Sequence, residues 1–235
     1  MGLPIIQHPT FELTIPSTKQ EIKYRPFLVK EEKILLLAQS GDNVKDMIKA
    51  IKQILNNCIV EGDVNLNQLP SFDIEYMFLQ LRANSVNSIA TLQFTDPETD
   101  KSEKVEVDLL SIGVTFPDEV NNNIDLGNGI SMTLKYPTYD AIGSIDSTDA
   151  SKGTMQLIEM CVDKVYSGED TVQSLSDFSE KEVNEFLESL RGDIMKQIQT
   201  FFEGMPKLEH TVHYGTGEIK KSHAFTGIAD FFSFA

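Results

Sequence analysis

Three histidines near the C-terminal end of the sequence are the residues best placed to do chemistry, because imidazole serves both as an acid–base group and as a zinc ligand. A two-residue turn at Thr216 and Gly217 would place His210 opposite His223 on one face of a β-hairpin, with His213 on the other face. A zinc site needs three or four converging ligands, and this region contains no cysteine. We therefore predict a cross-strand imidazole pair and no metal site.

The rest of the sequence carries no reactive constellation of a familiar kind. It has no phosphate-binding glycine loop, no GxSxG nucleophile motif and no HExxH zinc motif. Glu31 and Glu32 could be proposed as a glycosidase pair, but acids at a helix start are expected because they favour the helix dipole. Cys58 and Cys161 lie in helical patterns, which predicts buried, reduced thiols. The sequence thus favours an interaction protein over an enzyme and predicts no cofactor.

The charge balance excludes two classes of partner. The 235 residues include 20 basic and 36 acidic side chains, which gives a net charge of −16, so the surface repels nucleic acid and anionic lipid. The longest strongly apolar run, ILLLA at 34–38, is far shorter than the roughly 18 residues of a membrane-spanning helix. The N-terminal MGLPIIQHP lacks a basic segment followed by an apolar one. We expect a soluble, cytosolic protein with no nucleic-acid or membrane partner.

The N-terminal part of the chain is predicted to be an extended arm followed by helices. Prolines at positions 4, 9, 16 and 26 favour an extended arm over residues 1–26. A helix is expected from Lys30 to Gly41, and its four consecutive large apolar residues predict that it is covered on most sides. An amphipathic helix with a solvated lysine face is expected over residues 43–58.

The segment FDIEYMFLQLRANSV, residues 72–86, combines a dense apolar run with two acids and one arginine. Ser71 is expected to cap this helix, which would place Asp73 and Glu75 in the first turn, where carboxylates meet unpaired N–H groups. Apolar side chains on most of its sides predict a central helix. Arg82, two turns beyond Glu75, is expected to be a structural or interface counter-charge.

The middle of the chain changes to strand-like alternation. Apolar residues alternate at 90–94 and at 105–109, on either side of the turn-forming DPETDK, which predicts a β-hairpin. A further strand is expected at 130–136, after an exposed polar loop at 121–129. We therefore predict an antiparallel β insert over residues 89–139.

The last third of the chain is predicted to return to helices and then to a hairpin. A helix is expected from about residue 154 to Gly168. The capping box of Ser179 and Glu182 begins a helix of about 24 residues, in which Gly192 is a weak point. The aromatic side chains at the C-terminal end are costly to leave in water, so we expect them to dock on a core; they are Phe231, Phe232 and Phe234.

These elements predict an α+β fold that is mainly helical, with an antiparallel β insert and a C-terminal β-hairpin. A single domain over residues 1–235 is expected. Its parts are an extended arm plus helical core at 1–88, the β insert at 89–139, a helical part at 154–208, and the hairpin and aromatic tail at 209–235.

Three segments of the sequence resemble one known family. YRPFLVKEEKILLLAQSGD at 24–42, FDIEYMFLQLRANSV at 72–86 and the terminal FTGIADFF are similar to the baseplate hub assembly proteins of T-even-like contractile-tailed bacteriophages. The resemblance implies a non-enzymatic late protein of tail morphogenesis, made in the host cytoplasm, that is a structural component or an assembly factor of the central hub. It also implies other hub proteins as partners in a homo- or hetero-oligomer, and a place in the virion tail baseplate for a resident subunit.

We expect the charged and aromatic residues of these segments to form an interface or a structural motif. They are Arg25, Phe27, Glu31, Glu32, Asp73, Glu75, Arg82, Phe231, Phe232 and Phe234. The sequence leaves two other functions open. One is an acidic adaptor that binds other proteins, and the more remote one is a metal-dependent enzyme that uses the C-terminal histidine hairpin.

Overall fold

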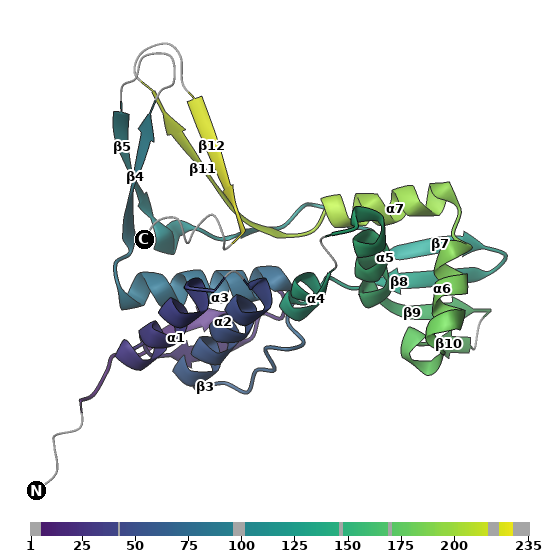
Figure 1. Ribbon diagram of the computed structural model, residues 1–235, viewed down its shortest axis with the longest axis horizontal. Helices are drawn as coiled ribbons and strands as arrows, with labels where there is room; N and C mark the ends of the chain where they lie inside the picture. The colour runs from purple at the N-terminus through teal and green to yellow at the C-terminus, as the bar shows by residue number, and fades with distance from the viewer. Residues whose placement is uncertain are drawn as a thin grey trace, which may run out of the picture. The chain divides into compact units, whose positions relative to one another are not determined.

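The computed structural model describes residues 6–41, 43–95, 102–145, 148–168, 171–215 and 221–227. The chain divides into two compact units, whose elements are labelled in Figure 1. Unit 1 consists of Met1–Thr115 and Lys207–Ala235, and unit 2, Phe116–Pro206, is inserted between them. None of the described helices is long and apolar enough to cross a bilayer.

Unit 1 starts with a small antiparallel sheet and three helices. The sheet has the order β1-β2-β3, with strands β1 (Phe11–Thr14), β2 (Glu21–Tyr24) and β3 (Ile59–Glu61). The helices are α1 (Val29–Gln39), α2 (Val44–Cys58) and α3 (Ser71–Ser85). The described part of the predicted arm therefore contains a β-hairpin, in which Leu13 pairs with Ile22 and both side chains are buried.

Helix α3 is the centre of unit 1. Ten of its 15 residues are buried, because large apolar side chains occur on every side of it. Phe72, Ile74 and Phe78 are each at most 2% exposed, so the prediction of a central helix is confirmed. The predicted cap is wrong, since Ser71 is the first helical residue and Pro70 occupies the N-cap position without a side-chain hydrogen bond.

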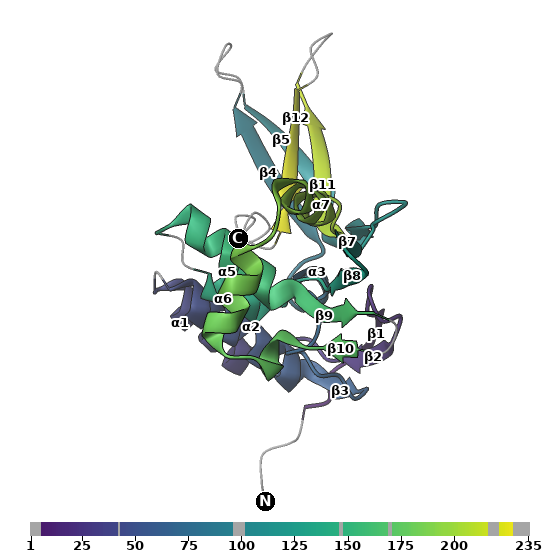
Figure 2. The same ribbon diagram turned by 90° about the vertical axis from the view of Figure 1, so that its right-hand side faces the viewer.

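Two antiparallel hairpins complete unit 1 and lie side by side in both views (Figures 1 and 2). Their strands are β4 (Ile89–Thr95), β5 (Ser102–Asp108), β11 (Lys207–Tyr214) and β12 (Lys221–Thr226). The β4–β5 hairpin is the predicted one, and it reaches the other hairpin through Phe94 and Tyr214, whose ring centroids lie 4.2 Å apart. A turn of 3-10 helix, η1 (Leu109–Ser111), follows β5.

The two chain connections between the units lie next to each other on unit 1. Strand β6 (Val114–Thr115) pairs with β11 on the edge opposite β12. In this pairing Thr115, the last residue before unit 2, lies opposite Lys207, the first residue after it. The insertion therefore begins and ends at one point of a continuous antiparallel ladder.

Unit 2 is an antiparallel sheet with four helices, and three of these helices pack on one face of the sheet. The strand order is β10-β9-β8-β7, with β7 (Asn123–Gly127), β8 (Ile130–Leu134), β9 (Val162–Ser167) and β10 (Thr171–Gln173). The helices are α4 (Tyr139–Ser144), α5 (Ala150–Cys161), α6 (Glu180–Glu188) and α7 (Gly192–Glu203), with a 3-10 turn, η2 (Leu175–Asp177). Ile124, Met132 and Val165 pair across neighbouring strands, so they share one face. The buried side chains of α5, α6 and α7 join the same core; they are Ile158, Val183, Leu187, Ile194, Ile198 and Phe201.

The predicted proportions of the fold are wrong. The fold is α+β, but strands occur along the whole chain and form four separate sheets among the described residues, so it is not mainly helical with one insert. The strand expected at 130–136 is β8, which pairs with β7 and β9 in unit 2 and not with the β4–β5 hairpin. The C-terminal hairpin is not a separate element either, because β11 also pairs with β6.

Two of these strands have weak local signals. Strand β7 lies inside the polar segment 121–129, where an exposed loop is predicted, yet Ile124 is only 1% exposed. Strand β9 begins at Val162, directly after α5, with no glycine or proline between the helix and the strand. The expected helix up to Gly168 therefore ends early, and the β-branched Val162 and Val165 belong to the sheet.

The expected long helix after residue 179 is two helices. The predicted capping box is present, since Ser179 accepts from the Glu182 amide and the Glu182 carboxylate accepts from the Ser179 amide. Helix α6 ends at Glu188, and the hydroxyl of its C-cap residue, Ser189, donates to the Phe186 carbonyl at 2.6 Å and so competes with continuation of the helix. Helix α7 then starts at Gly192, a poor helix former.

Candidate protein interaction site

The N-terminal segment of the family resemblance is attached to the last turn of α3. The amide group of Asn84 donates to the Tyr24 hydroxyl at 2.7 Å. The backbone N–H of Phe27 donates to the Ser85 hydroxyl at 2.9 Å. Phe27 lies half-buried between β2 and α1. Its backbone is fixed to α3 by this hydrogen bond.

The C-terminal segment reaches the same helix. Phe225 is buried in a core cluster that includes Leu79 of α3. Gly227 follows with a φ of +71°, and a Cβ atom added there would lie 3.5 Å from the Glu75 carboxylate oxygen Oε1. Segments that are far apart in the sequence, 24–42, 72–86 and the described start of FTGIADFF, therefore meet on α3.

Arg25 and Glu31 form an ion pair that fixes the start of α1. The Arg25 guanidinium donates to Glu31 Oε1 at 3.1 Å, and the Leu28 amide donates to Oε2 at 2.9 Å. Burial acts to raise the pKa of Glu31, but these hydrogen bonds outweigh it and hold the pKa below its ordinary value. Arg25 also donates to the Asn57 carbonyl at 2.9 Å, at the end of α2. Both charged groups therefore face inward and join α1 to α2.

The opposite side of α1 is apolar and open to solvent. Val29, Leu36 and Leu37 are 66%, 58% and 75% exposed. They lie on the same side of the helix as Lys33, at intervals of three, four and seven residues, and we call these four residues the outer face of α1. Glu32 is exposed at the edge of this face. The prediction that this helix is covered on most sides is wrong within unit 1.

Asp73 is bound by the N-terminal hairpin and not by the start of its own helix. Its carboxylate is completely buried and accepts hydrogen bonds from both the amide and the hydroxyl of Ser17; the amide lies 3.0 Å from Oδ1. Burial raises the pKa of Asp73 above its ordinary value, although both hydrogen bonds act to lower it. Asp73 therefore ties the β1–β2 turn to α3.

Arg82 is half-buried on α3 without a counter-charge in the part of the chain that the structure describes. Burial lowers the pKa of its guanidinium. The expected pairing with Asp73 is not present, because that carboxylate is bound to Ser17. A half-buried guanidinium can donate hydrogen bonds to a carboxylate of another molecule.

A comparison with known families places these segments inside one long match. Residues 8–233 match the family described as T4 bacteriophage base plate protein. The chain belongs to this family. No curated protein and no solved structure matches it. The resemblance seen in the three motifs is confirmed at the level of a T4-like baseplate protein, and it supports a structural role in the phage baseplate.

The charged residues predicted for the site separate into three groups in this baseplate protein. Arg25, Glu31 and Asp73 face inward, Glu75 and Arg82 are half-buried on α3, and Glu32 is exposed. The predicted aromatic residues of the tail, Phe231, Phe232 and Phe234, lie outside the described residues. The exposed leucines of α1 were missed because hydrophobic residues occur on all sides of this helix, so periodicity does not show which side faces solvent.

The histidine pair of the baseplate protein has a different register from the predicted one. His210 lies opposite Phe225, and His223 lies opposite Val212. The His223 ring packs against Phe225 with a centroid distance of 4.5 Å. In the described ranges no group of three or more His, Cys, Asp or Glu residues is positioned to hold a metal ion. The turn at 216–217 lies outside the described residues. In the described strands His210 and His223 are not paired, so the arrangement that suggested a metal-dependent enzyme is not found there.

Proposed function

We propose that this baseplate protein is a non-enzymatic morphogenesis protein of the central hub, either as a resident structural subunit or as an assembly factor. The family match supports the baseplate, and the motifs at 24–42, 72–86 and 225–232 support the hub. Its partners are other hub proteins. It acts in the host cytoplasm during assembly, and a resident subunit is carried into the virion tail.

The outer face of α1 is the observation that carries this proposal. Leu36 and Leu37 are adjacent, well exposed and held on a helix that the Arg25–Glu31 pair fixes in place. Covering a large apolar side chain contributes about 1.5 to 3 kcal/mol. A helix that is already fixed loses little conformational entropy when a partner covers it. We assign this face to a contact with another hub protein.

Mass spectrometry of purified phage particles and of isolated hub intermediates tests the proposal. Presence of the chain in both samples would make it a structural subunit, and presence only in the intermediates would make it an assembly factor. Absence from both would contradict the hub role and favour the alternative of an acidic adaptor for other proteins.

A substitution on α1 tests the proposed contact directly. Leu37→Asp places a charge on the outer face and is expected to remove the chain from hub intermediates while the protein stays folded, because Leu37 is 75% exposed. Leu110→Asp is the matched control, since Leu110 is an exposed leucine of η1 outside this face. Equal incorporation of the two variants would contradict the contact.

A further inference from the structure

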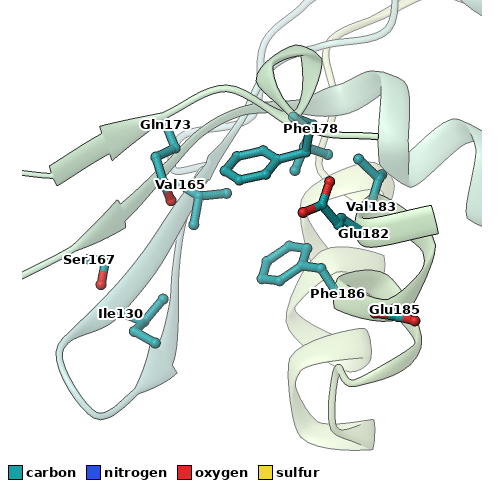
Figure 3. Close-up of a pocket in the computed structure, with 10 residues that line it drawn as sticks. Ile130, Val165, Ser167, Gln173, Phe178, Glu182, Val183, Glu185 and Phe186 are labelled. Atoms are coloured by element: carbon teal, nitrogen blue, oxygen red, sulfur yellow. The ribbon is translucent and has the colours of Figure 1, made fainter. Parts of the chain in front are cut away.

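Unit 2 contains an apolar groove between its sheet and its helical side (Figure 3). The cavity has a volume of about 410 Å³. The sheet contributes Ile130 of β8 and Val165 of β9, and the rings of Phe178 and Phe186 extend toward Val165 from the other side. This volume is within the range of about 300 to 1,000 Å³ that is usual for binding pockets.

Part of the apolar lining of the groove is exposed. Phe178, which follows η2, is 39% exposed, and Phe186 of α6 is only half-buried. A ligand that fills the groove would therefore remove aromatic surface from water, which favours binding.

The groove lies in the acidic part of the molecule. Unit 2 contains 17 acidic and 6 basic side chains, which leaves a net charge of −11 out of −16 for the chain. Glu182 and Glu185 of α6 line the groove, and further exposed acids lie along the same segment; they are Asp177, Glu180 and Glu188. The only basic residue between positions 177 and 188, Lys181, pairs with Glu185 at 3.5 Å.

The Glu182 carboxylate is ionised at neutral pH and held in position. The hydroxyl of Ser179 lies 2.6 Å from its Oε2, and the Ser179 amide donates to the same oxygen at 2.9 Å. These two hydrogen bonds hold the pKa of Glu182 below its ordinary value. The groove thus combines an apolar floor with a fixed negative charge at its side.

We propose that this groove binds a short segment of another baseplate protein that carries a large apolar side chain next to lysine or arginine residues. The apolar side chain fills the space between Val165 and the two phenylalanine rings, and the basic residues meet Glu182 and Glu185. This inference rests on the proposed function, and it names the chemistry of one partner. The chain's own C-terminal residues, IADFFSFA, do not match this chemistry, because they contain an aspartate and no base.

A tryptophan peptide provides a direct test, since the chain itself contains no tryptophan. The probe is an acetylated and amidated hexapeptide with the order Lys-Lys-Trp-Leu-Lys-Lys. Its fluorescence is titrated with the full chain at low and high salt. We expect a saturable blue shift of the emission, because the indole leaves water, and an affinity that falls as the salt concentration rises.

Matched variants assign the binding to the groove. Phe178→Ala is expected to weaken the affinity for the peptide about tenfold, as for an aromatic anchor. Phe116→Ala is the control and is expected to leave the affinity unchanged, because it removes a phenylalanine of similar exposure elsewhere in unit 2. Glu185→Gln is expected to weaken binding about threefold and Glu188→Gln to have no effect, because Glu188 does not line the groove. Circular dichroism and the thermal transition check that each variant is folded.

Several results would overturn the proposal. They are the absence of a fluorescence shift, an equal effect of Phe178→Ala and Phe116→Ala, and equally strong competition by a lysine peptide with serine in place of tryptophan and leucine. If the molar mass of the protein doubled as its concentration rose, and Phe178→Ala returned it to the monomer value, the occupant of the groove would instead be a second copy of the chain. The assay needs no phage particles, so a failure here is distinguishable from a failure of the hub assignment by mass spectrometry.

Discussion

The buried carboxylate of Asp73 accepts hydrogen bonds from both the amide and the hydroxyl of Ser17, a residue that lies 56 positions earlier in the chain. This contact joins the turn of the N-terminal hairpin to the first turn of the central helix. Its removal therefore measures how strongly the hairpin is attached.

Asp73→Ala is expected to destabilise the protein by about 1 to 3 kcal/mol, because the half-buried amide and hydroxyl of Ser17 lose their acceptor. Asp73→Asn is expected to cost less, since the amide oxygen can still accept from the Ser17 amide and its NH₂ group can donate to the hydroxyl. Denaturant unfolding gives both values. Equal losses for the two variants would show that these hydrogen bonds are not the source of the effect.

Arg25 and Glu31 are expected to be coupled in stability. Glu31→Gln leaves the guanidinium without its counter-charge and is expected to lower the free energy of unfolding by about 1.5 to 3 kcal/mol. The double variant Arg25→Met, Glu31→Leu is expected to recover much of this loss, because no unpaired charge remains at the site. Denaturant unfolding of the single variants Arg25→Met and Glu31→Leu and of the double variant gives the coupling energy.

The exposed pair of Lys23 and Glu61 serves as the control for this measurement. Its side chains are 41% and 65% exposed, so Glu61→Gln is expected to leave the unfolding free energy unchanged. A loss from Glu61→Gln as large as that from Glu31→Gln would contradict the assignment of the stability to the buried pair.

The two buried carboxylates are expected to have opposite effects on the pH dependence of stability. The pKa of Glu31 is lowered, so its contribution is present above the ordinary glutamate pKa and is lost as the pH falls through the lowered value. The pKa of Asp73 is raised, so its contribution is complete below the ordinary aspartate pKa and is lost as the pH rises through the raised value. The lowered pKa of Glu31 therefore stabilises the protein at neutral pH, whereas the raised pKa of Asp73 does not.

Unfolding of Glu31→Gln and Asp73→Asn across the acidic range checks these signs. The difference between wild type and Glu31→Gln is expected to shrink as the pH falls, whereas the difference between wild type and Asp73→Asn is expected to shrink as the pH rises. Curves that run parallel to the wild type would mean that neither carboxylate changes its pKa on folding.

The predictable parts of this molecule are those that local sequence determines. Alternation over 90–94 and 105–109 predicts the β4–β5 hairpin, and apolar residues on all sides predict the central position of α3. The contact of Asp73 with Ser17 depends on residues far apart in the sequence, and nothing near Asp73 indicates it. Asp73 does lie in the first turn of α3, as the sequence predicts, but its carboxylate is bound by Ser17 and not by the N–H groups of its own helix.

The groove of unit 2 illustrates the same limit. Val183, Phe186 and Leu187 predict one apolar side of a helix, but the space beside Phe186 also depends on β8, on β9 and on Phe178 after η2. The sequence signal for β9 is weak, because this strand follows α5 directly. A site made from elements with weak signals could not be found from the sequence.

Removal of unit 2 is expected to leave unit 1 folded. Thr115 and Lys207 pair directly in the β6–β11 ladder, so a short glycine-containing turn can replace 116–206 without stretching the chain. Circular dichroism and an amide NMR spectrum of the shortened chain check this, with the isolated 116–206 segment measured alongside. An unfolded shortened chain would support the single cooperative domain that the sequence predicts.

Arg82 is expected to contribute to partner binding more than to stability. Its guanidinium is half-buried and has no counter-charge among the residues that the structure describes, so Arg82→Met removes a desolvated charge and keeps the length of the side chain. We expect an unchanged or higher free energy of unfolding, together with weaker association with hub intermediates. Arg82→Lys separates charge from geometry, because lysine keeps the charge and loses the planar fork that binds a carboxylate through two hydrogen bonds. If Arg82→Met left both stability and association unchanged, the residue would have neither a structural nor an interface role, whereas a large loss of stability would place its partner within the chain itself.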